Sequence, residues 1–424
     1  MRHRHHPLHP ARLLRRTAPT LAAAALAVPL CAASPAAAAP PEGLLCNGVA
    51  PTRWATANGQ VVTGTSGNDV ISANGFHGLT LNGGGGNDVV CGPPVPAGTD
   101  TGNTLVGGSG DDLLISSGGR ERLIGGAGND RLVGTIHDDV DYSTDGYAPG
   151  SVGIRVDLVA GTVTGARTGS DTVVGVDQAR FFGTSGADTF LGDEEPNWFD
   201  AGAGADTVHG NGGNDWIHAV APALADGGTG NDTITVGYGG RVLGGTGNDL
   251  LAADPNNALS GASPDRGTVT GYRLNGQDGN DTFKVNTLRT GATTWSADAA
   301  QRWRGTIRGG GGRNSVDLRW LGSQGVSVSL LSGTATWHTG SATLRSVQRV
   351  IGTPAADRLV GGNGRDALIG LAGDDVVMGR RGDDLLQGNA GDDRLLGGYG
   401  RDHADGGQGR DTCHGDEAVA RCEG

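Results

Sequence analysis

The C-terminal stretch from Gly352 to His414 decides the fold. It reads GTPAADRLV, GGNGRDALI, GLAGDDVVM, GRRGDDLLQ, GNAGDDRLL, GGYGRDHAD and GGQGRDTCH, seven consecutive nine-residue units without an insertion. Each unit has Asp at its sixth position, and most have an aliphatic residue two places later. A strict period in a Gly-rich chain predicts a repeat architecture rather than a low-complexity, disordered segment.

The spacing within a unit predicts how the chain folds. Glycine allows a tight turn because it adopts positive φ without a steric penalty. The last three residues of a unit are expected to form a short strand whose central side chain points inward. Two units then make one coil, and stacked coils lie about 4.8 Å apart. On this stacking one edge carries Asp357, Asp375, Asp393 and Asp411, and the other carries Asp366, Asp384 and Asp402.

Stacked aspartates predict a metal. Their carboxylates and the turn carbonyls converge as hard oxygen ligands, which suit Ca²⁺, whereas uncompensated carboxylates would repel one another. Similar units occur earlier, such as GTSGNDVIS from Gly64, GTSGADTFL from Gly183 and GQDGNDTFK from Gly276. We expect several Ca²⁺ ions, with ligands at Asp69, Asp88, Asp112, Asp130, Asp188, Asp206, Asp215, Asp232, Asp249, Asp281, Asp357, Asp366, Asp375, Asp384, Asp393, Asp402 and Asp411.

These units resemble the hemolysin-type calcium-binding repeat, or RTX repeat, G-G-x-G-x-D-x-U-x with U a large aliphatic residue. The resemblance covers most of the chain after residue 40. It implies an all-β fold, a parallel β-roll or β-solenoid, in which turns hold Ca²⁺ between stacked coils. Degenerate units place Glu121, Asn197 and Asn314 at the Asp position, where binding should be weak or absent. Asp215, Asp232 and Asp249 lie seventeen residues apart, which predicts a locally shorter coil.

Two stretches with alternating β-branched residues and a Gly-Thr turn separate the repeats, which is typical of extra β-strands. We therefore expect an N-terminal repeat block at 40–140, a β connector at 141–182, a middle repeat block at 183–283, a second β connector at 284–351, and a C-terminal repeat block with a cysteine cap at 352–424. No separate globular domain is evident in this arrangement.

The first 39 residues have the order of a secretory signal peptide: a basic segment, an apolar segment at Leu21–Leu30 and an Ala-rich segment. That apolar segment is too short to span a membrane. Four cysteines remain after it, and an even number in an exported chain favours disulfides. Of the three possible connectivities, we favour Cys46–Cys91 and Cys413–Cys422, because each pair brackets one end of the repeats. A secreted, extracellular location is expected.

The composition bears on function as well. A net charge of −13 argues against nucleic-acid binding, which needs clustered Lys and Arg. Neither an H-E-x-x-H helix nor a G-x-S-x-G nucleophile motif occurs, so we expect no enzyme. The expected function is calcium binding coupled to folding, in a structural or adhesive role outside the cell. The alternative is a secreted calcium-dependent enzyme acting on an extracellular polymer, with its site on the β face of 284–351. A cell-surface or polymer partner is expected but not identified.

Overall fold

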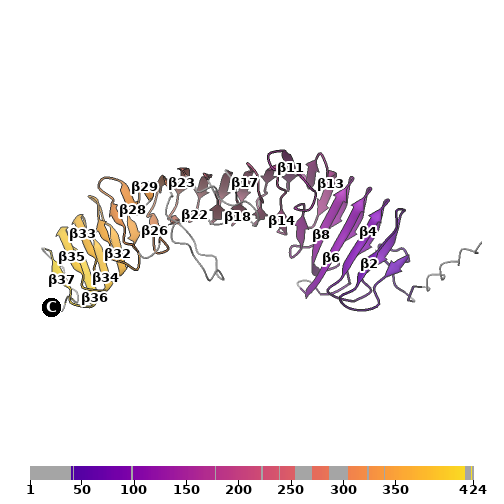
Figure 1. The fold of residues 1–424 in the computed structure, drawn as a ribbon, viewed down its shortest axis with the longest axis horizontal. Coiled ribbons are helices and arrows are strands. Elements are labelled where there is room, and N and C mark those ends of the chain that lie inside the picture. The colour runs from indigo at the N-terminus through magenta and orange to yellow at the C-terminus, as the bar shows by residue number, and fades with distance from the viewer. Residues whose placement is uncertain are drawn as a thin grey trace, which may run out of the picture. The chain divides into compact units, whose positions relative to one another are not determined.

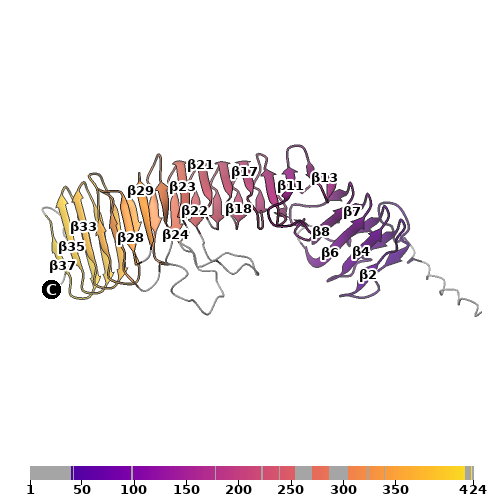
Figure 2. The ribbon, with the colours of Figure 1, turned by 45° about the horizontal axis from the view of Figure 1, so that its top comes forward.

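The computed structural model describes residues 40–41, 43–96, 99–176, 178–220, 223–237, 239–253, 270–285, 304–321, 324–338, 340–415 and 422. Within these residues every regular element is a β-strand, and the strands form two long sheets of 21 and 16 strands (Figures 1 and 2). In the described part of the chain, no helix is long and apolar enough to cross a membrane. The predicted signal peptide, residues 1–39, lies outside the described residues.

The C-terminal repeats show how a coil is built, because each coil gives one strand to each sheet. Val377 pairs with Leu359 and Leu395 in one sheet, and Leu386 pairs with Leu368 in the other, always in parallel. These partners lie eighteen residues apart, which confirms the predicted coil length. The strands here are β30 (Arg349–Ile351), β31 (Arg358–Val360), β32 (Ala367–Ala372), β33 (Val376–Arg381), β34 (Leu385–Ala390), β35 (Arg394–Tyr399), β36 (His403–Gln408) and β37 (Thr412–His414).

The core is a stack of inward side chains, one rung for each strand. Leu359, Val377 and Leu395 from one sheet face Leu368 and Leu386 from the other, and all five are fully buried. Larger residues fill the same position further along, where the rings of Phe190 and Phe199 lie 5.1 Å apart. Burial of such side chains contributes about 1.5–3 kcal/mol each to folding. The aliphatic residue two places after Asp is therefore the core residue, as the spacing predicts.

The N-terminal repeats form the same two-sheet ladder. Val70, Val89, Leu113 and Arg131 are successive partners in one sheet. Leu81, Leu105 and Leu123 are successive inward partners in the other. The strands are β1 (Arg53–Trp54), β2 (Val61–Thr63), β3 (Val70–Ser72), β4 (Thr80–Gly85), β5 (Val89–Cys91), β6 (Thr99–Ser109), β7 (Leu113–Ile115), β8 (Gly119–Ala127), β9 (Arg131–Val133) and β10 (Asp139–Asp141).

Part of the middle repeats uses a shorter coil. Thr207 pairs with Leu224 and Leu224 with Arg241, so these coils have seventeen residues, as the aspartate spacing predicts, whereas Thr189 and its partner Thr207 lie eighteen residues apart. The strands are β14 (Arg180–Phe182), β15 (Ala187–Leu191), β16 (Trp198–Asp200), β17 (Thr207–Gly212), β18 (Trp216–Ala219), β19 (Leu224–Thr229), β20 (Thr233–Val236), β21 (Arg241–Thr246), β22 (Leu250–Ala253), β23 (Thr270–Asp278), β24 (Thr282–Val285), β25 (Arg304–Arg308) and β26 (Ser315–Asp317).

Both expected connectors contain three antiparallel strands that belong to the 21-stranded sheet. The first set is β11 (Val152–Asp157), β12 (Thr162–Gly165) and β13 (Gly169–Val174), and the second is β27 (Ser327–Ser329), β28 (Thr334–Trp337) and β29 (Gly340–Arg345). The outer strands of each set pair in parallel with repeat strands, so the sheet continues through the connector. Within 284–351, β25 and β26 still follow the coil pattern, because the unit containing Asn314 keeps its place in the ladder.

Candidate metal-binding turns

The sixth-position aspartates form a hydrogen-bonded ladder along each edge of the C-terminal repeats. The backbone N–H of Asp375 donates to Oδ1 of Asp393 at 2.8 Å, and that of Asp393 donates to Oδ1 of Asp411 at 2.9 Å. On the other edge Asp366 donates to Asp384 at 2.8 Å, and Asp384 donates to Asp402 at 3.0 Å. The structure therefore brings together the residues that the sequence assigned to each edge.

The same ladder runs through the other repeats. In each case the backbone N–H of one aspartate donates to Oδ1 of the equivalent residue in the next coil. The remaining sequence-predicted ligands fall into three such runs: Asp69, Asp88, Asp112 and Asp130; Asp188 and Asp206; and Asp215, Asp232, Asp249 and Asp281. The backbone N–H of Asp357 donates to Oδ1 of Asp375 at 2.7 Å. All seventeen predicted residues thus occupy equivalent positions, on turns between the two sheets.

The second carboxylate oxygen of most ladder residues is buried and accepts no hydrogen bond. This holds for Oδ2 of Asp88, Asp112, Asp130, Asp206, Asp215, Asp232, Asp249, Asp281, Asp375, Asp384, Asp393 and Asp402. A buried charged oxygen without a partner is unfavourable by several kcal/mol, because burial removes its hydration. These twelve oxygens therefore require either a proton or a cation.

In nine of these twelve units, glycine at the first position lets the unpaired Oδ2 atom lie against the backbone, close to a carbonyl oxygen of the next coil. A Cβ atom added to Gly370 would overlap Oδ2 of Asp375 and would lie 3.0 Å from the carbonyl oxygen of Gly388 in the next coil. A Cβ atom on Gly379 would meet Oδ2 of Asp384 and would lie 2.7 Å from the Gly397 carbonyl oxygen. A carboxylate oxygen and a carbonyl oxygen from successive coils therefore lie close to the same glycine, and these are the donors that Ca²⁺ takes. The residues fit that ion.

Side chains alone do not make a metal site here. Among the described residues, no group of three or more His, Cys, Asp and Glu side chains is close enough to hold an ion. A cation in these turns would be held by aspartate oxygens together with backbone carbonyls. Mixed carboxylate and carbonyl sets of this kind are typical of Ca²⁺ sites.

Burial and neighbouring carboxylates raise the pKa of the ladder residues. Burial, together with the charges of Asp357, Asp393 and Asp374, raises the pKa of Asp375 to about 8. Burial raises the pKa of Asp112, Asp206 and Asp215 to about 7, and adjacent aspartates contribute to each shift. A bound cation would oppose this effect, because it favours the charged form of the carboxylate.

Four predicted ligands differ from the rest, because their second oxygen already has a donor. Oδ2 of Asp188 accepts the backbone N–H of Thr184 at 2.8 Å, while the Thr184 hydroxyl donates to Oδ1 at 2.8 Å. Thr353 makes the same two bonds to Asp357, and Thr65 bonds Asp69 through both groups. Asp366 accepts the N–H of Gly362. At the start of a block, the threonine of a Gly-Thr pair therefore supplies the hydrogen-bond donors that the aspartate carboxylate needs.

In two degenerate units, the polar side chain at the aspartate position also has hydrogen-bond partners within the protein. The Glu121 carboxylate accepts hydrogen bonds from the hydroxyls of Ser116 and Thr101. Asn314 accepts the N–H of Asp281 at 2.9 Å and donates to the carbonyls of Gly311 and Ser346. These side chains continue the ladder without leaving an unpaired carboxylate oxygen.

Sequence reasoning missed two ladder residues, Asp138 and Asp171. The N–H of Glu121 donates to Oδ1 of Asp138, and the N–H of Asp130 donates to Oδ1 of Asp171. Both are completely buried, and the hydroxyl of Tyr142 also donates to Oδ2 of Asp171 at 3.0 Å. Each precedes an inward valine by two places, so the D-x-U spacing was the available signal. Each unit keeps only one of the three glycines of the repeat, Gly134 at the second place and Gly169 at the fourth, so the pattern did not stand out.

The cysteines pair as favoured from the sequence. The structure joins Cys46 to Cys91, with Cα atoms 5.7 Å apart, and Cys413 to Cys422, with Cα atoms 5.9 Å apart. Both Cα separations lie within the usual range for disulfides. The first pair links the start of the described chain to β5, and the second lies next to the last strand, β37.

Comparison with known proteins agrees with this geometry. A model of the RTX calcium-binding nonapeptide repeat matches residues 54–75, 80–92, 97–140, 182–217, 351–386 and 387–417. The matched segments include aspartates with an orphaned oxygen at both ends of the chain, such as Asp112 and Asp384. No curated protein matches the chain.

Proposed function

We propose that the stacked turns bind Ca²⁺ and that the chain folds on binding, since the model of the RTX calcium-binding nonapeptide repeat matches several segments along the chain. The observation that carries the proposal is the row of buried Oδ2 atoms without a donor, nine of them beside a carbonyl oxygen of the next coil. We assign the principal ligands to the twelve aspartates with such an atom. Asp411, at the end of its ladder, is a further ligand. Asp69, Asp188, Asp357 and Asp366 bind only if their present donors move away.

Folding on binding follows from the charge of the ladders. Without cations the ladder carboxylates repel one another across stacked coils, and few large apolar side chains oppose that repulsion. Ligand binding to the folded state alone stabilises it by mass action. The metal contribution is therefore part of the folding free energy.

We further propose that the chain is exported and has a structural or adhesive role outside the cell. The signal-like order of residues 1–39 and the two cysteine pairs support export, since disulfides persist in oxidising compartments. Calcium is available at the concentrations that extracellular modules require, roughly 10⁻⁴ to 10⁻³ M.

Titration calorimetry with Ca²⁺ tests the proposed sites. In the test variant Asp375, Asp384 and Asp393 are all changed to Asn, which keeps an acceptor for the ladder but removes the charge. The control variant carries Asp374→Asn, Asp383→Asn and Asp392→Asn, an equal charge change on exposed residues one position earlier. We expect fewer ions bound by the test variant and unchanged stoichiometry in the control. Equal losses in both variants would mean that binding reflects general charge rather than these turns.

The alternative, a calcium-dependent enzyme acting on an extracellular polymer, predicts turnover. Hydrolase and lyase assays on a panel of polysaccharides, with the calcium-saturated protein, decide between the two. Product formation above a heat-denatured control would replace the structural proposal by the enzymatic one.

A further inference from the structure

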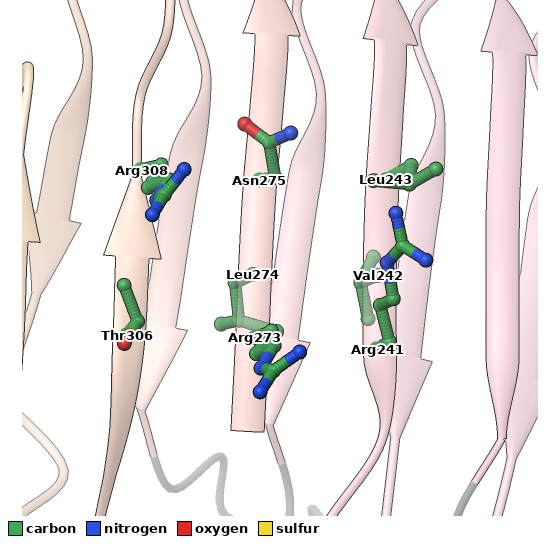
Figure 3. A pocket seen from close by; sticks show the side chains of 8 residues that line it. All are labelled: Arg241, Val242, Leu243, Arg273, Leu274, Asn275, Thr306 and Arg308. Carbon is green, nitrogen blue, oxygen red and sulfur yellow. The ribbon is translucent and has the colours of Figure 1, made fainter. Parts of the chain in front are cut away.

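The outer face of the 21-stranded sheet carries a pocket lined by three arginines from successive strands. Arg241 on β21 is the register partner of Arg273 on β23, and Arg308 on β25 is the register partner of Asn275. Leu243, Asn275 and Thr306 complete the outward-facing lining of a cavity of about 590 Å³. Figure 3 shows Arg241 and Arg273 extending from adjacent strands at the same level, with Arg308 on the next strand. We call these six residues the arginine pocket.

The arginine pocket concentrates positive charge in an acidic protein. All three arginines are exposed, and within the described residues neither Arg273 nor Arg308 forms an ion pair. Exposed Arg345 is the register partner of Arg308 on the far side of the pocket. Like charges directly opposite each other in a sheet are destabilising. Three neighbouring strands therefore present guanidinium groups that an anion would stabilise.

We propose that the arginine pocket binds an acidic saccharide, that is, a sugar unit carrying a carboxylate or a sulfate. Arginine presents a planar set of donors that matches such groups in a bidentate manner. The Asn275 amide and the Thr306 hydroxyl can bond sugar hydroxyls, and Leu243 offers an apolar contact for a ring face. The cavity volume lies in the range of small-ligand sites. It suits one or two sugar units better than a protein surface.

The surroundings disfavour nucleic acid as the ligand. A nucleic-acid site needs a long basic stripe, whereas this chain has a net charge of −13 and rows of acidic turns along its edges. The saccharide proposal goes beyond calcium binding, and it uses a sheet face rather than the turns. It requires only that the coils are stacked, because stacking pairs Arg241 with Arg273 and places Arg308 opposite Asn275 on the next strand.

Fluorescence anisotropy with labelled oligosaccharides, in calcium-saturated buffer, tests the proposal. The acidic probes are oligogalacturonate and a heparin-derived oligosaccharide, which distinguish carboxylate from sulfate, and methyl-esterified oligogalacturonate is the neutral probe. The test variant carries Arg241→Gln, Arg273→Gln and Arg308→Gln. The control variant carries Arg358→Gln, Arg381→Gln and Arg394→Gln, exposed arginines on β31, β33 and β35 of the same sheet. Circular dichroism and calcium titration confirm that both variants fold.

We expect at least one acidic probe to bind the wild type and the control variant equally well. The test variant should lose about tenfold or more in affinity, because it lacks the charged donors that make bidentate bonds to a carboxylate or sulfate. Three results would overturn the proposal: no binding of either acidic probe, equal binding of the neutral probe, or equal loss in both variants. Calcium bridging between the probe and the acidic turns would also leave the two variants equal, so it counts against the pocket.

Discussion

At the second position of many repeat units the backbone has positive φ, and five units place a residue other than glycine there: Asn211, Gln277, Leu371, Arg380 and Asn389. Leu371 has φ of 96° and Arg380 has φ of 80°, whereas Gly398 has φ of 107° at the equivalent position. A side chain in this region is strained by about 1–3 kcal/mol. Glycine relieves the strain but also increases the freedom of the unfolded chain.

We therefore expect Leu371→Gly to stabilise the calcium-bound protein by about 1 kcal/mol. Chemical denaturation in saturating calcium measures the change. Ala372→Gly serves as the control, because residue 372 does not have positive φ and glycine there should destabilise. A lower stability of Leu371→Gly would mean that the Leu371 side chain contributes more by packing than it loses by strain.

The threonine of a Gly-Thr pair at the start of a block should contribute to stability through its hydroxyl. Changing Thr184 to Val keeps the shape but removes the hydroxyl that bonds Asp188. In saturating calcium, where the coils are folded, this should lower the free energy of unfolding by about 1–3 kcal/mol, since a buried carboxylate loses a donor. Thr184→Ser keeps the hydroxyl and should stay close to the wild type. Equal stability of the Val and wild-type proteins would show that water replaces the hydroxyl.

The sequence predicts single residues well where the unit is regular. Asp375 and Asp384 follow from the nine-residue period and the inward aliphatic residue that comes two places later. Asp171 does not, because a β connector separates it from Asp130 by 41 residues and no period spans that gap. The role of Thr184 as a donor to Asp188 also depends on side-chain geometry that a repeat consensus does not encode.

At the scale of elements, the aspartate ladder predicts how stability depends on pH. The pKa of Asp375 is raised to about 8 in the folded state, above its ordinary value of 3.8, so the folded calcium-free protein holds protons that the unfolded chain releases. Stability from such groups is fully present below about pH 4 and is lost as the pH rises towards 8.

Calcium-free protein should therefore unfold at a lower denaturant concentration at pH 8 than at pH 5. Urea titrations in calcium-free buffer at several pH values test this expectation. Asp375→Asn should weaken the dependence on pH, whereas Asp374→Asn, which removes only one of the charges that raise the pKa of Asp375, should weaken it less. A midpoint that rises from pH 5 to pH 8 would contradict the raised pKa values.

The connectors show what a sequence pattern can and cannot say about an element. Alternating β-branched residues around a Gly-Thr turn predict extra strands at β11–β13 and β27–β29, and the structure confirms strands there. The pattern does not say which strands they pair with. β13 pairs with the edge of β9 and β11 with the edge of β15, and these strand edges exist only once the neighbouring coils have formed.

At the scale of the whole molecule, calcium should control whether the solenoid forms. The described chain has two sheets but only one narrow core, and the ladders place like charges along its edges. We expect far-UV circular dichroism to show little ordered β-structure in a chelator at neutral pH, and a strong β-signal in millimolar calcium. Magnesium at the same concentration is the control, since it demands stricter octahedral geometry. Identical spectra in chelator and in calcium would reject folding on binding.

The coil-by-coil pairing also determines how the molecule would respond to tension. Each repeat strand is bonded to strands about one coil away along the chain, as Val377 is to Leu359 and Leu395. A pull on the last coil therefore loads that coil and its neighbour, while the interior remains paired. Under tension the chain would lengthen in small steps, one coil at a time, and each coil would refold when the force drops. A tether made of such coils would therefore dissipate mechanical energy without breaking.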